Sequence, residues 1–262
     1  MLNKLIDKNS IEQSPIIDPI FIHLLQLFSI IANNSKKMLY KLFKIRVPVI
    51  LKVKEEKLTY LEEKALNDLF YTVEKIEHHK IEGNFIETGC ALGGSSIVIC
   101  KAKKKTRPFL IYDVFGMIPE PGEKDGDNVK ERFDTIKEGE SVGIDGDKYY
   151  GYEDDLLSKV VASFNKMGFN PEQNKVTFVK GLYQETLKID YKVAFAHIDC
   201  DWYNSVMTCL KQIVPRLSIG GCLVIDDYYY WAGCKKAVDE YFRDIKNDFD
   251  FIQKSRLHII KR

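Results

Sequence analysis

The chain has little net charge, few cysteines and no long apolar run, and each shortage excludes a class of protein. Its 39 Lys and Arg balance 38 Asp and Glu for a formal net charge of +1, unlike the strongly basic domains that bind nucleic acid. Its six cysteines form no C-x-x-C pair and have no His at zinc-ligand spacing, which predicts free thiols in a reducing cytoplasm. We therefore expect a cytoplasmic protein without a nucleic-acid partner.

The apolar stretch near the N-terminus, residues 16–31, is shorter than the roughly 20 apolar residues that a membrane-spanning helix needs. Asp18 and Pro19 interrupt it and suit the start of a helix, and no signal-peptidase site follows. We expect no integral membrane span. Residues 1–57 are predicted to form a helical extension, packed on the rest of the chain or on a second subunit of a homo-oligomer.

From residue 58 onward, short apolar runs alternate with segments of helical periodicity. This alternation predicts an α/β domain over 58–262 whose sheet is mainly parallel. Thr59 is expected to cap the first helix, with Glu62 completing a capping box. The last two runs, 249–253 and 257–261, alternate like a closing antiparallel hairpin, so seven strands are expected in all: 84–88, 109–114, 175–180, 193–198, 222–225 and the two of the hairpin.

A glycine-rich turn follows the first predicted strand and opens a helix. Gly89 and Gly93 permit positive φ and let a ligand approach backbone amides at the helix N-terminus. The spacing is not G-x-G-x-x-G, and no P-loop lysine follows. Glu87, just before the first glycine, suits a cationic ligand such as S-adenosylmethionine. We expect Thr88 and Ser95 to complete this cofactor-binding turn.

Asp113 ends the second predicted strand, where an acidic residue typically holds ribose hydroxyls in such folds. The alternative is a solvated loop aspartate. The stretch after it, residues 115–152, is dense in Gly, Pro, Asp and Glu and has the length of a lid or binding loop. A short helix is expected within it, at 129–136.

Two neighbouring strands end in pairs of carboxylates, Asp199 with Asp201 and Asp226 with Asp227. A helix of suitable length joins these strands, so they should be parallel and end at the same edge of the sheet. Four carboxylates at one edge repel one another unless a cation lies among them, and Mg²⁺ prefers such oxygen ligands. The alternative is that Asp226 and Asp227 merely cap the next element.

With these motifs in this order, the chain resembles the macrocin O-methyltransferase family, whose S-adenosylmethionine- and magnesium-dependent enzymes methylate sugar hydroxyls. The resemblance covers roughly residues 59–242 and implies the Rossmann-like class I methyltransferase fold. The residues that carry it are Phe85–Gly89 with Gly93–Gly94, Tyr112–Pro119, Lys180–Gly181 with Glu185–Leu187, His197–Ser205, Pro215–Ser218 with Gly220–Gly221, Asp226–Tyr228 and Gly233–Asp239.

The resemblance also implies roles for individual residues. Glu87, Gly89 and Asp113 would hold the cofactor, together with Asp199. Asp199, Asp226 and Asp227 would bind magnesium, and Asp199 or Asp201 would accept the proton of the attacking hydroxyl. The chain departs from the family at two positions, with Cys200 where Gly is frequent and Val114 where Thr or Ser is frequent.

The expected activity is therefore methyl transfer to a hydroxyl of a sugar, on a glycan or a natural-product glycoside. One alternative is a metal-dependent O-methyltransferase for catechols or other phenols, which the aromatic segment Tyr228–Trp231 would suit. Another is a non-catalytic cofactor-binding scaffold in glycan assembly, against which the intact acidic residues count.

Overall fold

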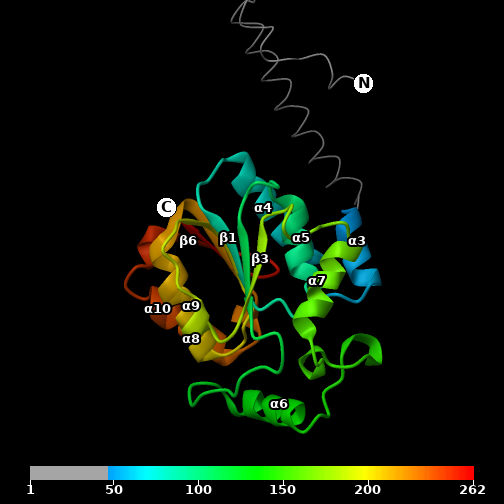
Figure 1. Cartoon of the computed structure of the whole chain (residues 1–262). Helices are drawn as coiled ribbons and strands as arrows, with labels where there is room; N and C mark the ends of the chain where they lie inside the picture. Colours follow the sequence, from blue (N-terminus) through cyan, green and yellow to red (C-terminus); the bar gives the residue numbers. More distant parts are fainter. Residues whose placement is uncertain (1–46) are drawn as a thin grey trace, which may run out of the picture. The chain divides into compact units, whose positions relative to one another are not determined.

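The structure, a computed structural model, describes residues 47–262 (Figure 1). The helix start at Asp18–Pro19 and the helices expected to contact a second subunit lie outside the described residues. The compact unit that holds the sheet runs from Pro48 to Arg262 and includes the first described helix, α3 (Pro48–Glu55), packed against α5. The division predicted at residue 58 stays a prediction. Among the described residues, no helix is both long and apolar enough to cross a membrane.

A seven-stranded sheet in the order β3-β2-β1-β4-β5-β7-β6 forms the centre of the domain. The first five strands are parallel, while β7 runs antiparallel to both β5 and β6. This arrangement confirms the predicted fold class. The strand bounds are β1 Asn84–Thr88, β2 Phe109–Asp113, β3 Val176–Lys180, β4 Val193–Ile198, β5 Leu217–Ile225, β6 Phe249–Gln253 and β7 Leu257–Lys261.

Helices cover both faces of the sheet (Figure 1). On one side lie α4 (Glu63–His78), α5 (Gly94–Ala102) and α7 (Leu156–Lys166); on the other lie α8 (Tyr183–Thr186), α9 (Tyr203–Ile213) and α10 (Ala232–Phe242). All six residues of β4 are buried, as expected of a strand with helices on both faces. The predicted short helix is present as α6 (Asp127–Lys137), apart from these layers at the lower end of Figure 1.

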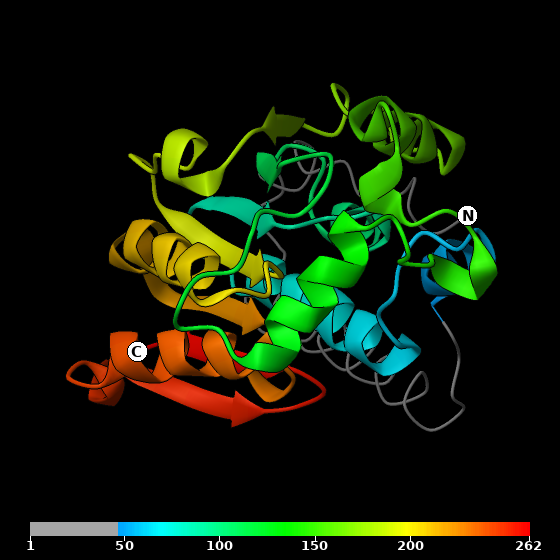
Figure 2. The same ribbon diagram turned by 90° about the horizontal axis from the view of Figure 1, so that it is seen from below.

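The register of the parallel strands brings their carboxyl ends to one edge. Thr88 at the end of β1 pairs with Ile198 at the end of β4, and Ile198 pairs with Ile225 at the end of β5. Gly89, Asp199 and Asp226 each follow one of these paired residues and therefore start at the same level. Seen from below in Figure 2, α6 lies in front of this edge.

One predicted helix start is wrong. Helix α4 begins at Glu63, not after Thr59, and its N-cap residue is Glu62. Thr59 is buried, and its Oγ1 accepts a hydrogen bond from the backbone N–H of Leu61. The main-chain oxygen of Leu58 accepts another from Gly94 at the start of α5. These contacts keep Thr59 outside the helix, and the chain bends at Tyr60 and Leu61 before α4 begins.

Candidate functional site

A cavity of about 590 Å³ lies at the carboxyl edge of the parallel strands. That volume is typical of a pocket for a small molecule. Its wall includes the glycine turn, the ends of β2, β4 and β5, the segment before α4, and side chains from α6 and the loop that follows it. The cavity is therefore formed by elements that lie far apart in the sequence.

The glycine turn is held by its own backbone and by Asp113. Gly89 has a φ of +86°, and a Cβ there would lie 1.6 Å from the main-chain oxygen of Asp199, so only glycine fits. The carboxylate of Asp113 accepts hydrogen bonds from the N–H groups of Cys90 (2.7 Å), Ala91 (3.3 Å) and Phe115 (2.7 Å). Burial raises the pKa of Asp113 despite these bonds.

Four of the residues expected to bind the cofactor border the cavity: Gly89, Ser95, Asp113 and Asp199. Thr88 and Gly93 do not. Thr88 is fully buried, and its Oγ1 has no hydrogen-bond partner among the described residues. Gly93 is the N-cap of α5, with a φ of +86°, and packs against Val160 of α7. Both residues therefore support the conformation of the glycine turn without bordering the cavity.

Glu87 also lies behind the cavity wall, which corrects the expectation that its carboxylate meets a cationic ligand. The side chain is fully buried and accepts a hydrogen bond from Ser96 Oγ. Its Oε1 lies 2.8 Å from Nδ1 of His197 on the neighbouring strand β4. Both oxygens are thus engaged inside the protein, and Glu87 acts as an internal counter-ion for His197.

The structure brings the four predicted carboxylates together on the cavity wall: Asp199, Asp201, Asp226 and Asp227. Asp201, at a left-handed φ of +53°, donates its backbone N–H to Asp227 Oδ2 at 3.1 Å. Burial and the charges of neighbouring carboxylates raise the pKa of Asp199 and of Asp227 well above the ordinary value. The same causes raise the pKa of Asp201 to about 6. The negative charges of these carboxylates are therefore not fully balanced by positive groups of the protein.

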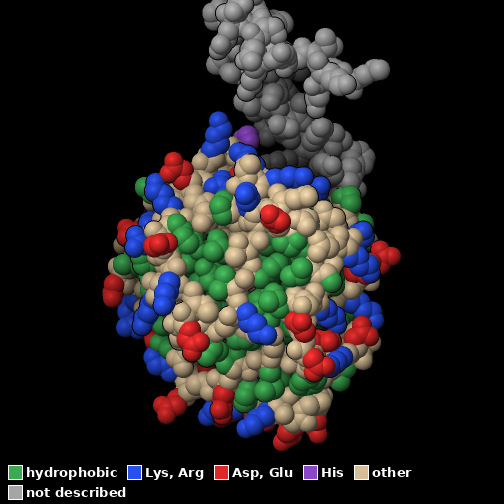
Figure 3. All heavy atoms as spheres, viewed as in Figure 1, with side chains coloured by type: hydrophobic (Ala, Val, Ile, Leu, Met, Phe, Trp, Pro, Cys, Tyr) green, Lys and Arg blue, Asp and Glu red, His purple; other side chains and the backbone are tan. Residues whose placement is uncertain are grey.

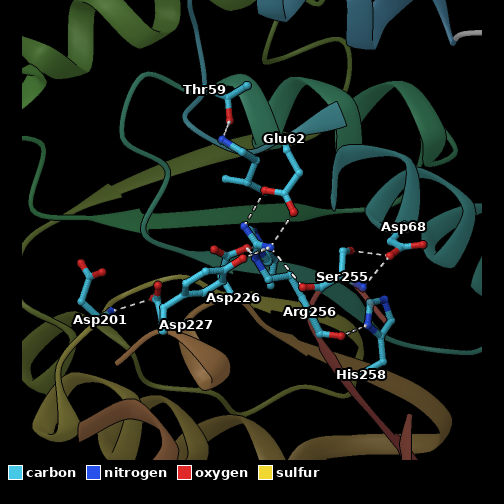
Figure 4. Close-up of polar contacts among 12 residues, drawn as sticks. Thr59, Glu62, Asp68, Asp201, Asp226, Asp227, Ser255, Arg256 and His258 are labelled. Atoms are coloured by element: carbon cyan, nitrogen blue, oxygen red, sulfur yellow. Dashed lines mark hydrogen bonds and ion pairs between the residues drawn. The ribbon is translucent and has the colours of Figure 1, made fainter. Parts of the chain in front are cut away.

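Asp226 differs from the other three because two cations contact it. Arg256 Nε donates to its Oδ1 at 2.8 Å (Figure 4). His197 Nε2 lies 3.4 Å from the same oxygen. Burial alone would raise the pKa of Asp226, but His197 and Arg256 outweigh it and hold the pKa below its ordinary value. Burial likewise opposes charge on His197, but Asp226 and Glu87 raise its pKa to about 10, so the imidazole is protonated.

The donor set fits a hard divalent cation. Ligand atoms of His197, Asp199 and Asp226 lie within 4.8 Å of one another. A protonated His197 donates to Glu87 and Asp226 and offers no lone pair, so the carboxylates are the available ligands. Arg256 and His197 share Oδ1 of Asp226, which leaves Oδ2 of that residue for a cation. A divalent ion there would also relieve the repulsion that raises the pKa of Asp199 and Asp227.

Sequence reasoning missed several residues that border the cavity. Arg132 of α6 and three tyrosines, Tyr60, Tyr149 and Tyr150, form one stretch of its wall. Arg256 lies in the turn between β6 and β7. No local pattern marks these residues, because their role depends on which distant segments meet. His197 lies in the family motif His197–Ser205, and its role could have been predicted. An ionisable residue in an otherwise apolar buried strand needs a charged or hydrogen-bonding partner.

The loop between β2 and α6 is fastened over this edge of the sheet. Asp125 is buried, and its Oδ1 accepts the backbone N–H of Tyr203 at the start of α9 (2.8 Å). Its Oδ2 accepts that of Gly122 (2.9 Å). Trp202 Nε1 donates to the main-chain oxygen of Pro119 at 2.9 Å. These bonds hold the predicted loop against the segment that carries Asp199 and Asp201.

Residues 54–255 match the TylF macrocin-O-methyltransferase family. The chain is 31% identical over 188 residues to 8-demethyl-8-(2,3-dimethoxy-alpha-L-rhamnosyl)-tetracenomycin-C 4'-O-methyltransferase of Streptomyces olivaceus. It is 29% identical over 185 residues to demethyldecarbamoylnovobiocin O-methyltransferase of Streptomyces niveus. Each match covers 68% of this chain and spans 65% of the relative's length.

The chain shares its fold with solved structures of O-methyltransferases. The O-methyltransferase NovP aligns with a TM-score of 0.65 at 24% identity, over 78% of this chain and 82% of NovP. An O-methyltransferase from Bacillus cereus, solved in complex with SAH, aligns with a TM-score of 0.51 at 11% identity, over 87% of this chain and 97% of that one. The predicted class I methyltransferase fold is therefore confirmed.

Proposed function

The chain belongs to the TylF macrocin O-methyltransferase family, and from that premise we propose that it transfers a methyl group from S-adenosylmethionine to a hydroxyl of a sugar, on a glycan or a natural-product glycoside. The observation that carries this proposal is the meeting of the glycine turn and four carboxylates in one cavity. The relative from Streptomyces olivaceus is named for methylation of a rhamnosyl compound, which supports a sugar acceptor.

The cofactor would lie against the glycine turn. Gly89 and Ser95 provide close approach to the backbone at the start of α5, and Asp199 provides a carboxylate for the cofactor's ammonium group. Oδ2 of Asp113 already accepts two backbone N–H groups, but Oδ1 accepts only that of Phe115, and its second lone pair could accept a ribose hydroxyl. Glu87 would act indirectly, by fixing His197 beneath Asp226.

Magnesium would bind Asp199, Asp226 and Asp227. When bound, the ion would draw charge from the acceptor hydroxyl and ease the loss of its proton. In this arrangement Arg256 and His197 orient Asp226 through Oδ1, and the backbone N–H of Asp201 orients Asp227 through Oδ2. The chain itself therefore fixes two of the three ligands before any ion arrives.

Asp201 is the side chain that we assign as general base. Of the four clustered carboxylates it is the one that would not be a magnesium ligand, and its side chain borders the same cavity. Its pKa of about 6 makes it mostly ionised at neutral pH. A general base works best when its pKa lies near the operating pH. The loop held by Asp125 would exclude water, so that the acceptor hydroxyl is the group that meets the cofactor's methyl.

The phenol alternative has less support. Of the aromatic segment Tyr228–Trp231 that suggested it, only Trp231 borders the cavity. Tyr230 instead lies over the guanidinium of Arg256, with 4.9 Å between Arg256 Cζ and the ring centroid. The segment therefore serves the fold around the acidic cluster more than it offers a flat surface to a planar acceptor.

The proposal is tested by incubating the full chain with S-adenosylmethionine and a panel of sugars, glycosides and a catechol, with magnesium or with EDTA. We expect one sugar acceptor to gain the mass of a methylene group only when magnesium is present. Asp227→Asn, which would remove a magnesium ligand but no residue assigned to the cofactor, is the matched inactive control, and calorimetric titration with S-adenosylhomocysteine checks that it still binds cofactor. Methylation of the catechol alone, or full activity in EDTA, would contradict the proposal.

A further inference from the structure

We propose that the acceptor carries an anionic group, and that Arg132 binds this group while the tyrosines beside it pack against the sugar. The inference rests on the proposed function and deepens it, since it narrows the acceptor from sugars in general to anionic sugars. It starts from the charged side chains of the cavity wall and from what each of them already contacts.

Two arginines border the cavity, and they differ in what they contact. Arg256 is buried and bound by both Glu62 and Asp226. Arg132 is half-buried on α6, and within residues 47–262 no carboxylate oxygen lies within 4.0 Å of its guanidinium. A guanidinium presents five N–H donors in a rigid fork. Those of Arg132 are therefore available to a ligand in the cavity.

An aromatic surface holds Arg132 in place. Its Cζ lies over the ring of Tyr149, 5.7 Å from the ring centroid, which is a cation–π contact. The Tyr149 and Tyr150 centroids are 4.5 Å apart, and Tyr60 lies 6.1 Å from Tyr150. The contact with Tyr149 gives the guanidinium no oxygen partner, so its N–H donors can bind a planar or tetrahedral oxyanion.

The same surface lies beside the proposed base. Arg132 and Asp201 both border the cavity. An acceptor held by its anionic group at Arg132, with the apolar face of its ring on the tyrosines, would extend toward Asp201.

The rest of the wall explains why an anion would need Arg132. The cavity is also bordered by Glu120 and by five aspartates: Asp113, Asp199, Asp201, Asp226 and Asp227. Until a cation binds among them, these carboxylates disfavour an anionic acceptor, and Arg132 is the positive group on the wall that has no carboxylate partner within residues 47–262. One positive group among negative ones fixes orientation as well as affinity. Phosphate on a sugar phosphate and carboxylate on a uronic acid share the required oxyanion chemistry.

The test measures binding by calorimetry, on the full chain saturated with S-adenosylhomocysteine and magnesium. The probes are glucose 1-phosphate, glucuronic acid and the neutral methyl glucoside, together with inorganic pyrophosphate. Arg132→Gln should weaken binding of the anionic probes about tenfold or more, the range for hydrogen bonds to charged groups, and leave methyl glucoside unchanged. Arg132→Lys keeps the positive charge but loses the forked arrangement of N–H donors. Its affinity for the anionic probes should lie between that of the unaltered chain and that of Arg132→Gln. Arg216→Gln, at an exposed position outside the cavity, is the charge-matched control and should bind like the unaltered chain.

The phosphate and carboxylate probes show which oxyanion the site prefers. Equal binding of the anionic probes to the unaltered chain and to Arg132→Gln would overturn the inference. So would preference for methyl glucoside over every anionic probe. Arg132-dependent anion binding without methyl transfer to any sugar would overturn the proposed function alone. Methylation of neutral sugars at a rate that Arg132→Gln does not change would overturn this inference alone.

Discussion

Arg256 forms a two-point ion pair with Glu62, which lies 194 residues earlier in the chain. Nη1 lies 2.9 Å from Oε1, and Nη2 lies 3.1 Å from Oε2. In Figure 4 the guanidinium lies between Glu62 and Asp226, and Asp201 lies beyond Asp227. One side chain from the β6–β7 turn thus joins the segment before α4 to the acidic cluster.

Replacement of Arg256 by Gln should lower the free energy of unfolding by about 3 kcal/mol, because it removes one of the two positive groups that contact the buried Asp226. Glu62→Gln should cost less than about 1 kcal/mol, since its side chain is 51% exposed. Urea denaturation measures both. The double variant should lose little more than Arg256→Gln alone, because the two residues share one interaction. Strictly additive losses would show that Glu62 and Arg256 act independently.

The assignment of Asp201 as base predicts a pH profile. Protonation of Asp201 near its pKa of about 6 should remove the base, so kcat/KM should rise as the pH increases through about 6 and then level off. Asp201→Asn should abolish that rise and leave only a low residual rate. Calorimetric binding of S-adenosylhomocysteine should stay as in the unaltered chain. A residual activity that keeps the same pH dependence would assign the base to another group, Asp199 first.

Gly89→Ala should abolish cofactor binding, because its Cβ would overlap the main-chain oxygen of Asp199 at 1.6 Å. Gly168→Ala is the matched control: its φ of +83° is similar, but nothing lies within 4 Å of the added Cβ. The free energy of unfolding of Gly168→Ala should fall by only about 1 kcal/mol, which is the cost of placing alanine in the left-handed conformation. Calorimetry and urea denaturation separate the two effects. Cofactor binding by Gly89→Ala would show that the turn can shift.

On the face drawn in Figure 3, acidic and basic side chains are interspersed, as the near-neutral composition leads one to expect. The sequence also predicted β4, β6 and β7 to the residue, because each is a short apolar or alternating run with clear ends. It placed the four carboxylates at one edge because parallel strands must end together.

The local sequence pattern gave wrong predictions for residues whose contacts come from distant segments of the chain. Thr59 has the chemistry of a helix cap, yet its segment contacts α5 and stays outside the helix, which begins at Glu63. Glu87 has the chemistry of a ligand-binding acid, yet His197 of the neighbouring strand takes its carboxylate. The pairing of Glu62 with Arg256 could not be read from either residue, because it depends on the approach of the C-terminal hairpin to the start of α4.

His258 of β7 is buried in neutral form next to the network of Arg256. Its Nδ1–H donates to the main-chain oxygen of Arg256 (3.2 Å), as Figure 4 shows, so its Nε2 accepts from Thr72 Oγ1 (3.1 Å). Burial, and then the charge of Lys254, lower the pKa of His258 to about 4. Protonation would force a second proton onto Nε2, where the hydroxyl of Thr72 already donates.

This shift predicts how stability depends on pH. Between the ordinary histidine pKa of about 6.5 and a folded value of about 4, the unfolded chain binds a proton that the folded chain refuses. The free energy of unfolding should therefore fall as the pH decreases through that window, by up to about 3 kcal/mol from this residue. His258→Gln keeps a donor and an acceptor but cannot titrate, so its stability should fall less steeply over the same range. Urea denaturation of both proteins at matched pH values gives the difference, in which the carboxylates common to both cancel. Parallel curves would mean that the folded protein admits the proton, and that His258 is more accessible than its contacts imply.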